Sequence, residues 1–289
     1  MKTPVKFTYT TTTALRQALE ARLANISKQQ GIDIQRLRRQ VAFDRLLCRL
    51  FLDPQAPWIL KGGYAMELRL TESRTTRDID LGMRRPMSGA GAVAERMLTL
   101  LQKEAGADIG DFFTFTIGQA MMDIEAAPYG GARFPVEARL DGRVFARFHL
   151  DVAAGDAVID PAEEVNGHDW FDFCGIPAGT FPAIPKEQQF AEKLHSYTLP
   201  RGDQINMRFR DLLDMVLLIR LGMDKEKARV ALTRTFDRRG THPIPDTLLP
   251  PPEIWERPYA ALAAECSVTL DAQTSFENVS AFVLSLSAP

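Results

Sequence analysis

The stretch RTTRDIDLG, residues 74–82, carries Asp78 and Asp80 in a run that is otherwise typical of a buried strand. Residues two apart in a strand project to the same face, with a spacing of roughly 7 Å. Desolvating two unpaired charges there would be costly. Two divalent cations about 4 Å apart would remove this cost and would clamp the attacking and leaving oxygens of a nucleotidyl transfer. The alternative is a surface ion network in which Arg74 and Arg77 neutralise the aspartates.

Gly62 and Gly63 lie between a predicted strand, PWIL, and a predicted short helix, YAMELRL. Backbone N–H groups of such a turn, at the positive end of a helix, can line a phosphate site, and Lys61 would add a positive charge beside it. The simpler explanation is a tight turn without a ligand. The aspartate pair follows this turn along the chain, as we expect if both features serve one site.

The segment ARLDGRVFARFHLDVAAGD predicts a β-hairpin, because Asp141-Gly142 lies between two alternating runs. In the second arm an apolar face that starts at Val144 alternates with a less apolar face, which comprises Phe145, Arg147, His149 and Asp151. Asp151 would supply a third carboxylate that completes a metal site or helps to deprotonate an attacking hydroxyl. A solvated aspartate at a strand end is the alternative.

The elements that would position these residues indicate an α+β protein. Strands are predicted at RDIDLGM and DFFTFTIG, and helices are predicted over residues 12–29, 33–52 and 88–105. Prolines punctuate residues 161–185, which we interpret as a loop-rich crossing, and the pattern beyond Lys186 is helical. We therefore predict an α/β lobe with two leading helices over residues 1–160 and a helical lobe over residues 161–289.

The composition is that of an ordinary folded protein, with 45% hydrophobic and 25% charged residues in a chain of 289. No apolar run approaches the roughly 18 residues that span a bilayer, and the N-terminus lacks the apolar core of a signal peptide. The three cysteines are scattered and predict reduced thiols. We expect a cytoplasmic protein with no membrane association, and a monomer, because no strong exposed apolar stripe is evident.

The formal net charge of −2 argues against a protein that coats nucleic acid with a broad basic surface. Local clusters of arginine still allow an anionic partner to dock, because guanidinium groups bind phosphate in a bidentate manner. One such cluster surrounds the aspartate pair and comprises Arg74, Arg77, Arg84 and Arg85.

Five segments taken together, KGGYAMELRL, RTTRDID, HLDV, EKLH and MRFRDLLD, resemble the AbiEii/AbiGii group of nucleotidyltransferase-like toxins, which includes the MenT proteins. The resemblance runs from about residue 35 to residue 220. It implies a polymerase-beta-type nucleotidyltransferase core with a mixed sheet, followed by a helical C-terminal lobe. It also implies a Mg²⁺-dependent enzyme that moves a nucleotide from an NTP to an acceptor. For MenT-like members that acceptor is the 3′ end of tRNA, which stops translation, and an AbiEi-type antitoxin is encoded alongside.

The resemblance also implies roles for individual residues. Together with the glycine turn it implies nucleotide binding by Lys61, Gly62, Gly63, Tyr64 and Lys193, with Lys193 of EKLH on the triphosphate. A two-metal site would be held by Asp78, Asp80 and Asp151, and Asp211 of FRDLLD would be the carboxylate of the last motif. The family usually has Gly-Ser where this chain has Gly63-Tyr64, which removes a hydroxyl that could contact a phosphate.

Two of these placements also have structural explanations. Lys193 could be a surface lysine whose aliphatic stem packs on the helix, with its charge in water. Asp211 could form an ion pair with Arg208 or Arg210, and it lies three residues from Asp214, so the two carboxylates would be neighbours on one helix.

Three functions fit these observations. The first is a toxin nucleotidyltransferase that modifies tRNA, with the arginines around the aspartate pair as contacts for the RNA backbone. The second keeps the same chemistry but transfers the nucleotide to a protein or a small molecule. The third is a nucleotide-sensing module that binds a partner and has no catalytic turnover.

Overall fold

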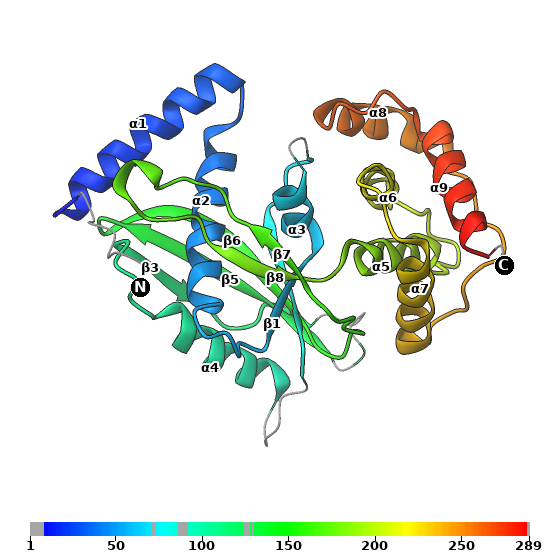
Figure 1. Cartoon of the computed structure of the whole chain (residues 1–289), viewed down its shortest axis with the longest axis horizontal. Helices are drawn as coiled ribbons and strands as arrows, with labels where there is room; N and C mark the ends of the chain where they lie inside the picture. Colours follow the sequence, from blue (N-terminus) through cyan, green and yellow to red (C-terminus); the bar gives the residue numbers. More distant parts are fainter. Residues whose placement is uncertain (1–8, 71–72, 86–91, 124–127, 129, 288–289) are drawn as a thin grey trace. The chain divides into compact units, whose positions relative to one another are not determined.

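The computed structural model describes residues 9–70, 73–85, 92–123, 128 and 130–287 (Figure 1). The contacts divide the chain into two compact units. The first comprises Met1–Arg69, Thr75–Gly155 and Glu164–Ala183, and the second comprises Leu70–Arg74, Asp156–Glu163 and Ile184–Pro289. The lobe boundary that we expect after residue 160 stays a prediction.

One mixed sheet of eight strands runs through the described residues of the first unit, in the order β3-β5-β6-β2-β1-β8-β7, with β4 paired to β5. Neighbouring strands pair in parallel at β2/β6 and β1/β8 and antiparallel at β1/β2, β3/β5, β4/β5 and β5/β6. The strands are β1 (Trp58–Lys61), β2 (Asp78–Met83), β3 (Phe113–Ile117), β4 (Met122–Asp123), β5 (Gly131–Leu140), β6 (Arg143–Ala153), β7 (Glu163–Asn166) and β8 (Thr180–Ala183). The expected α+β class with a mixed sheet is confirmed.

Four helices among the described residues complete the first unit: α1 (Thr12–Gln30), α2 (Ile34–Leu50), α3 (Gly62–Arg69) and α4 (Val93–Ala105). The two leading helices are confirmed, and their N-cap residues Thr11 and Asp33 accept backbone N–H groups with their side chains. Of the helix expected over residues 88–105, residues 88–91 lie outside the described part of the chain. Helix α2 contacts β6, and α4 contacts β3 and β5; Figure 1 shows both helices beside the sheet.

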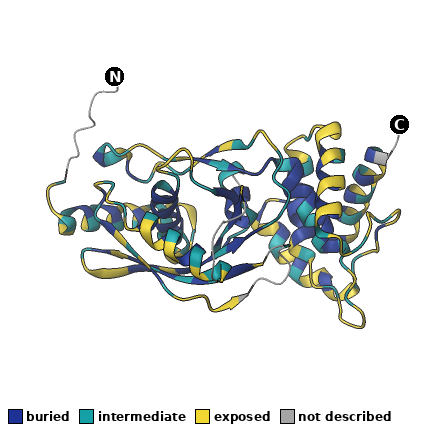
Figure 2. Ribbon diagram, turned by 90° about the horizontal axis from the view of Figure 1, so that it is seen from below, coloured by how far each residue is buried: buried dark blue, intermediate teal, exposed yellow. Residues whose placement is uncertain are grey.

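The alternation of buried and exposed residues along β6 shows which face of the sheet meets the helices. Phe148, Leu150 and Val152 are buried, whereas Arg147 is exposed and His149 and Asp151 are partly exposed. Figure 2 shows the buried residues along the sheet and the helices that cover it. The other face of β6 and its neighbours therefore carries the polar residues.

The hairpin is confirmed, but the expected alternation is wrong near its turn. Asp141 and Gly142 both have positive φ, as a two-residue primed turn requires. Val144 is 41% exposed and Phe145 is buried, the reverse of the prediction. The cause is a register shift between Ala138 and Arg139, where one extra residue in β6 moves side chains to the other face.

The crossing over residues 161–185 contains two strands that the sequence pattern did not indicate. Strands β7 and β8 have four residues each, and β8 pairs with β1 through Leu60 and Ala183. So short a strand carries little periodic signal, and Pro182 lies inside β8. Residues 164–183 belong to the first unit by their contacts.

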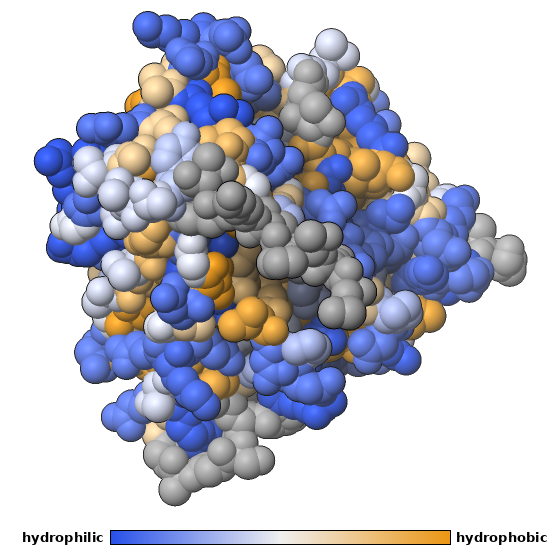
Figure 3. Space-filling view, turned by 60° about the vertical axis from the view of Figure 1, so that its left-hand side comes forward, coloured by the Kyte–Doolittle hydropathy of each residue, from blue (hydrophilic) through white to orange (hydrophobic). Residues whose placement is uncertain are grey.

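The described part of the second unit is helical beyond Lys186, as expected. Its helices are α5 (Lys186–Thr198), α6 (Phe209–Arg220), α7 (Lys225–Arg239), α8 (Glu256–Glu265) and α9 (Ala272–Ser287). No helix in the described ranges is long and apolar enough to cross a membrane. Cys48, Cys174 and Cys266 form no disulfide with one another in the described part of the chain. On the face drawn in Figure 3, hydrophilic residues surround small hydrophobic patches, an ordinary pattern for a protein surface.

Candidate active site

Four charged residues form a row across the sheet. Lys61 of β1 lies opposite Asp80 of β2, Asp80 lies opposite Asp151 of β6, and Asp151 lies opposite Arg133 of β5. Side chains directly opposite each other on neighbouring strands have Cβ atoms about 5 Å apart on the same face. The row therefore brings the Asp80 and Asp151 carboxylates side by side, with a cation on each flank.

The glycine turn lies directly against Asp80. Gly62 has a φ of 65°, in the left-handed region, and a Cβ at this position would lie 2.0 Å from Oδ2 of Asp80. The backbone N–H of Gly63 donates to the same oxygen at 3.3 Å. The structure thus brings together the turn and the aspartate that the sequence places apart, and a side chain at residue 62 would displace the carboxylate.

Two residues earlier on β2 and β6, Asp78 lies opposite His149, and these two residues form a second row. Nδ1 of His149 is 3.1 Å from Oδ1 of Asp78, and a guanidinium nitrogen of Arg133 is 3.7 Å from Oδ2 of Asp78. Arg133 also donates two hydrogen bonds to Asp151, at 2.7 and 2.6 Å. These bonds raise the pKa of Arg133 above its usual value, so its charge is fixed. We did not single out Arg133 or His149 from the sequence as site residues.

The three carboxylates are neighbours in register, but their side chains do not converge on one point. No group of three acidic, histidine or cysteine side chains in the described ranges is arranged to hold a metal ion. Carboxylate oxygens are nevertheless the donors that Mg²⁺ prefers. Asp78 and Asp80 fit that requirement by type and position, whereas both Asp151 oxygens accept hydrogen bonds from Arg133. The metal role of the three residues stays a prediction.

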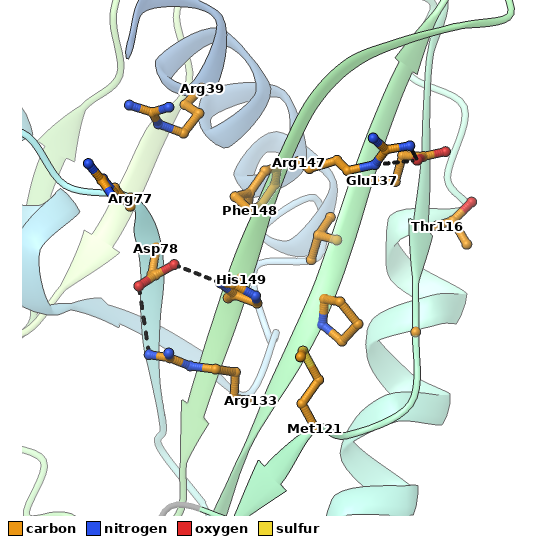
Figure 4. Close-up of a pocket in the computed structure, with 13 residues that line it drawn as sticks. Arg39, Arg77, Asp78, Thr116, Met121, Arg133, Glu137, Arg147, Phe148 and His149 are labelled. Carbon is orange, nitrogen blue, oxygen red and sulfur yellow. Dashed lines mark hydrogen bonds and ion pairs between the residues drawn. The ribbon is translucent and has the colours of Figure 1, made fainter. Parts of the chain in front are cut away.

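A cavity of about 740 Å³ opens beside Asp78 (Figure 4). Its lining combines four arginines with two carboxylates and several apolar residues. The lining residues are Arg39, Arg77, Asp78, Thr116, Gly118, Met121, Arg133, Pro135, Val136, Glu137, Arg147, Phe148 and His149. Arg39 comes from α2, 39 positions before Asp78, and no local pattern in the sequence connects it with the site.

Tyr64, at the position where the resemblance implies a serine, has its side chain in the core. Its hydroxyl donates to Oδ1 of Asp44 at 2.6 Å, and its ring packs edge-on against Phe43. Burial, with a further contribution from Asp44, raises the pKa of Tyr64 well above its usual value. The tyrosine hydroxyl is therefore hydrogen-bonded in the core and does not face the turn. Any ligand at the turn would bind the backbone of Gly62 and Gly63.

The second unit holds a separate cluster of four charges. Nζ of Lys193 on α5 lies 2.9 Å from Asp211 and 2.8 Å from Asp214 on α6, and Arg74 binds Asp214 through two bonds of 2.8 Å. Arg208 is 3.5 Å from the other oxygen of Asp211. The structure thus brings Lys193 and Asp211 together. It also places Asp214 and Arg74 in this cluster, which the sequence does not predict.

These contacts set the charge states of the cluster. Burial alone would lower the pKa of Lys193, but the carboxylates of Asp211 and Asp214 outweigh it and raise the pKa. Burial alone would raise the pKa of Asp214, but Lys193 and Arg74 outweigh it and lower the pKa to about 2. Lys193 and Asp214 are therefore both charged at neutral pH.

The four arginines that we proposed as RNA contacts have different environments. Arg74 is used in the ion pair with Asp214, so its guanidinium is committed to that carboxylate. Arg77 is exposed and lines the cavity, whereas Arg84 and Arg85 are exposed but do not line it. The structure therefore singles out Arg77 as the member beside the carboxylates.

The family model described as "Nucleotidyl transferase AbiEii toxin, Type IV TA system" matches residues 45–281. The solved structure of MenT4, a nucleotidyltransferase toxin from Mycobacterium tuberculosis, superposes with a TM-score of 0.57 at 18% identity, covering 93% of this chain and 98% of MenT4. JHP933 from Helicobacter pylori superposes with a TM-score of 0.49 at 13% identity, covering 88% of this chain and 93% of its own. A comparison with curated proteins gave no match. The chain belongs to the AbiEii nucleotidyltransferase toxin family of type IV toxin–antitoxin systems.

Proposed function

We propose that this protein is a Mg²⁺-dependent toxin that transfers a nucleoside monophosphate from an NTP to the 3′ end of tRNA and thereby inhibits translation. The observation that carries the proposal is the row of Asp80 and Asp151 against the glycine turn, in a chain of this family. An antitoxin of AbiEi type, encoded alongside, would complete the system.

The turn and its neighbours would bind the donor. Backbone N–H groups of Gly62 and Gly63 would face the triphosphate, and Lys61, next to them in the row, would neutralise part of its charge. For Lys193 we propose the triphosphate-binding role that the family pattern implies, because its raised pKa keeps it positively charged. Asp211 would hold the Lys193 ammonium in place.

Asp78 and Asp80 would hold Mg²⁺, with Asp151 as the third carboxylate once Arg133 releases it. Bound ions would supply stabilisation of the charge that develops on the α-phosphate and on the attacking and leaving oxygens. In the transfer itself, the acceptor 3′-oxygen forms a bond to the α-phosphorus, the bond from that phosphorus to the β-phosphate oxygen breaks, and pyrophosphate leaves. Asp151 would take the proton of the attacking hydroxyl.

The test is to incubate the purified protein with Mg²⁺, bacterial tRNA and each α-labelled NTP in turn, and to read the label on a denaturing gel. We expect label on tRNA with one NTP, reduced at least about 1,000-fold in Asp80→Asn, because this substitution keeps the shape but removes the charge. Asp203→Asn, at an exposed position of the second unit, is the matched control and should leave the label unchanged.

Other outcomes would redirect the proposal. Label on the 32.3 kDa protein band, and none on tRNA, would indicate a protein acceptor. Pyrophosphate release that depends on an added small molecule would indicate a small-molecule acceptor. No transfer with any NTP, together with NTP binding, would contradict an enzyme and favour a module that senses nucleotides.

A further inference from the structure

Two of the arginines that line the cavity beside Asp78 form no close ion pair among the described residues. Arg133 and Arg147 are bound to Asp151 and Glu137. Within the part of the chain that the structure describes, the side chains of Arg39 and Arg77 form no hydrogen bond and no ion pair, and Nε of Arg39 is buried without a partner. Figure 4 shows Arg39 and Arg77 at the same end of the cavity, next to Asp78.

The two guanidinium groups repel each other, and an anion between them would relieve this repulsion. Burial is the largest influence on the pKa of Arg39 and lowers it; Asp33 and Glu67 act in the opposite direction, and the charge of Arg77 adds to the lowering. A buried polar group without a partner costs free energy, and surface arginines usually find a carboxylate. A guanidinium pair that faces a cavity matches the geometry of a phosphate group, which accepts bidentate hydrogen bonds from arginine.

The rest of the lining suits a nucleotide. Met121 is 62% exposed and lies at the side of the cavity away from Arg39, where Figure 4 also shows Thr116, and Pro135 is another lining residue. A thioether and a proline ring offer an apolar surface for a base or a ribose, and a methionine adapts its shape to different ligands. The hydroxyl of Thr116 can donate or accept a hydrogen bond.

We infer that this cavity is the acceptor subsite, in which Arg39 and Arg77 bind a backbone phosphodiester of a single-stranded 3′ end. The inference rests on the proposed function, in which the donor triphosphate uses the glycine turn and Lys61. Because the cavity begins at Asp78, a nucleotide held there by its 5′-side phosphodiester presents its 3′-hydroxyl to the carboxylates. The smallest efficient acceptor is therefore an oligonucleotide with at least one phosphodiester, and a nucleoside is a poor one.

The test compares acceptors of increasing length at saturating NTP: a ribonucleoside, a dinucleotide and a trinucleotide, each with a free 3′-hydroxyl. In the wild type we expect kcat/KM to rise at least about tenfold when the first phosphodiester is added, which corresponds to about 1.4 kcal/mol. Arg39→Gln and Arg77→Gln should each abolish most of this rise through the KM of the acceptor, while the KM of the NTP stays unchanged. Arg77→Lys should restore part of it.

Arg143→Gln is the matched control, because Arg143 is an exposed arginine of β6, the strand that carries Asp151, and does not line the cavity. An equal loss in Arg143→Gln would overturn the inference, since a general surface charge would then explain the result. An increase in the KM of the NTP, with an unchanged KM of the acceptor, would also overturn it and would place the donor in the cavity.

A second measurement separates this inference from the proposed function. Fluorescence anisotropy of a labelled trinucleotide, with no NTP present, reports binding even if the protein transfers nothing. We expect the affinity for the trinucleotide to fall at least about tenfold in the Arg39→Gln/Arg77→Gln double variant. We also expect the slope of log affinity against log salt concentration to decrease by the amount due to roughly two phosphate contacts. Absence of binding, or binding unaffected by the double substitution, would overturn the subsite whatever the outcome of the transfer assay. Equal melting temperatures would establish that the variants are folded.

Discussion

The row of charges on the sheet and the cluster on α5 and α6 use the same residue types in different surroundings. On the sheet, the side chains of Arg133 and Asp151 in the row are 33% and 16% exposed, and that of Asp78 in the neighbouring row is 30% exposed. In the cluster, those of Lys193 and Asp214 are 15% and 1% exposed. Water therefore screens Asp78 and Arg133 and can replace their contacts, whereas it is largely excluded from Asp214.

This difference suggests different tasks for the two sets. An exposed ion pair contributes little to stability and can be exchanged for contacts with a ligand at low cost. A buried cluster with two cations and two anions is held together by mutual compensation, so removing one member leaves an uncompensated buried charge. We therefore expect ligand binding to depend on the row and the stability of the fold to depend on the cluster.

The largest expected effect is on stability in the cluster. Asp214→Ala leaves Lys193 and Arg74 with one nearby carboxylate, and we expect the free energy of unfolding to fall by about 3–5 kcal/mol. Asp78→Ala, in the exposed row, should change it by less than about 1 kcal/mol. Urea denaturation of both variants would measure the contrast. Equal losses would show that burial does not distinguish the two sets.

The pH dependence of the same cluster is the next largest effect. The pKa of Asp214 is lowered to about 2 in the folded protein, against about 3.9 in the unfolded chain. A lowered pKa contributes stability above the unfolded pKa, and this contribution is lost as the pH falls from about 4 to about 2. The integrated amount is about 2–3 kcal/mol.

Comparison with Asp214→Asn separates this contribution from that of carboxylates far from the cluster, which are the same in both proteins. We expect the wild type and the variant to differ by a constant free energy of unfolding above about pH 5, and the difference to shrink by about 2–3 kcal/mol towards pH 2. Urea denaturation at a series of pH values would measure it. A difference that does not vary with pH would contradict a lowered pKa for Asp214.

Much of the row could be predicted from the sequence because its signals are local. The spacing of Asp78 and Asp80 fixes them on one face of a strand. The glycine pair marks the turn, and Asp141-Gly142 marks the hairpin that carries Asp151. Each of these predictions depends on residues that are close together in the chain.

The partners of these residues could not be predicted, because they depend on register and tertiary packing. Counted from the turn without a bulge, Ala132 would lie opposite Asp151; the register shift between Ala138 and Arg139 places Arg133 there instead. Arg39 reaches the cavity only because α2 packs against β6. Local sequence patterns predict neither the register shift nor the packing of α2 against β6.

The smallest expected effect on stability comes from Arg133, the residue that the bulge brings into the row. Arg133→Gln should change the free energy of unfolding by less than about 1 kcal/mol, because its guanidinium is 33% exposed. The same substitution frees both oxygens of Asp151 and removes a positive charge that lies 3.7 Å from Asp78. If the carboxylates hold divalent ions, their affinity for a cation must then rise.

Mn²⁺ provides a direct readout of that affinity, because the free ion is counted by its electron paramagnetic resonance signal without any substrate. We expect Arg133→Gln to bind Mn²⁺ several-fold more tightly than the wild type, by about 1 kcal/mol for one exposed charge removed at close range. Arg147→Gln is the control: Arg147 is also exposed and ion-paired on this face, but to Glu137. If Arg133→Gln and the wild type bind Mn²⁺ equally, then Asp151 is not a ligand, and its bond to Arg133 is a permanent part of the sheet.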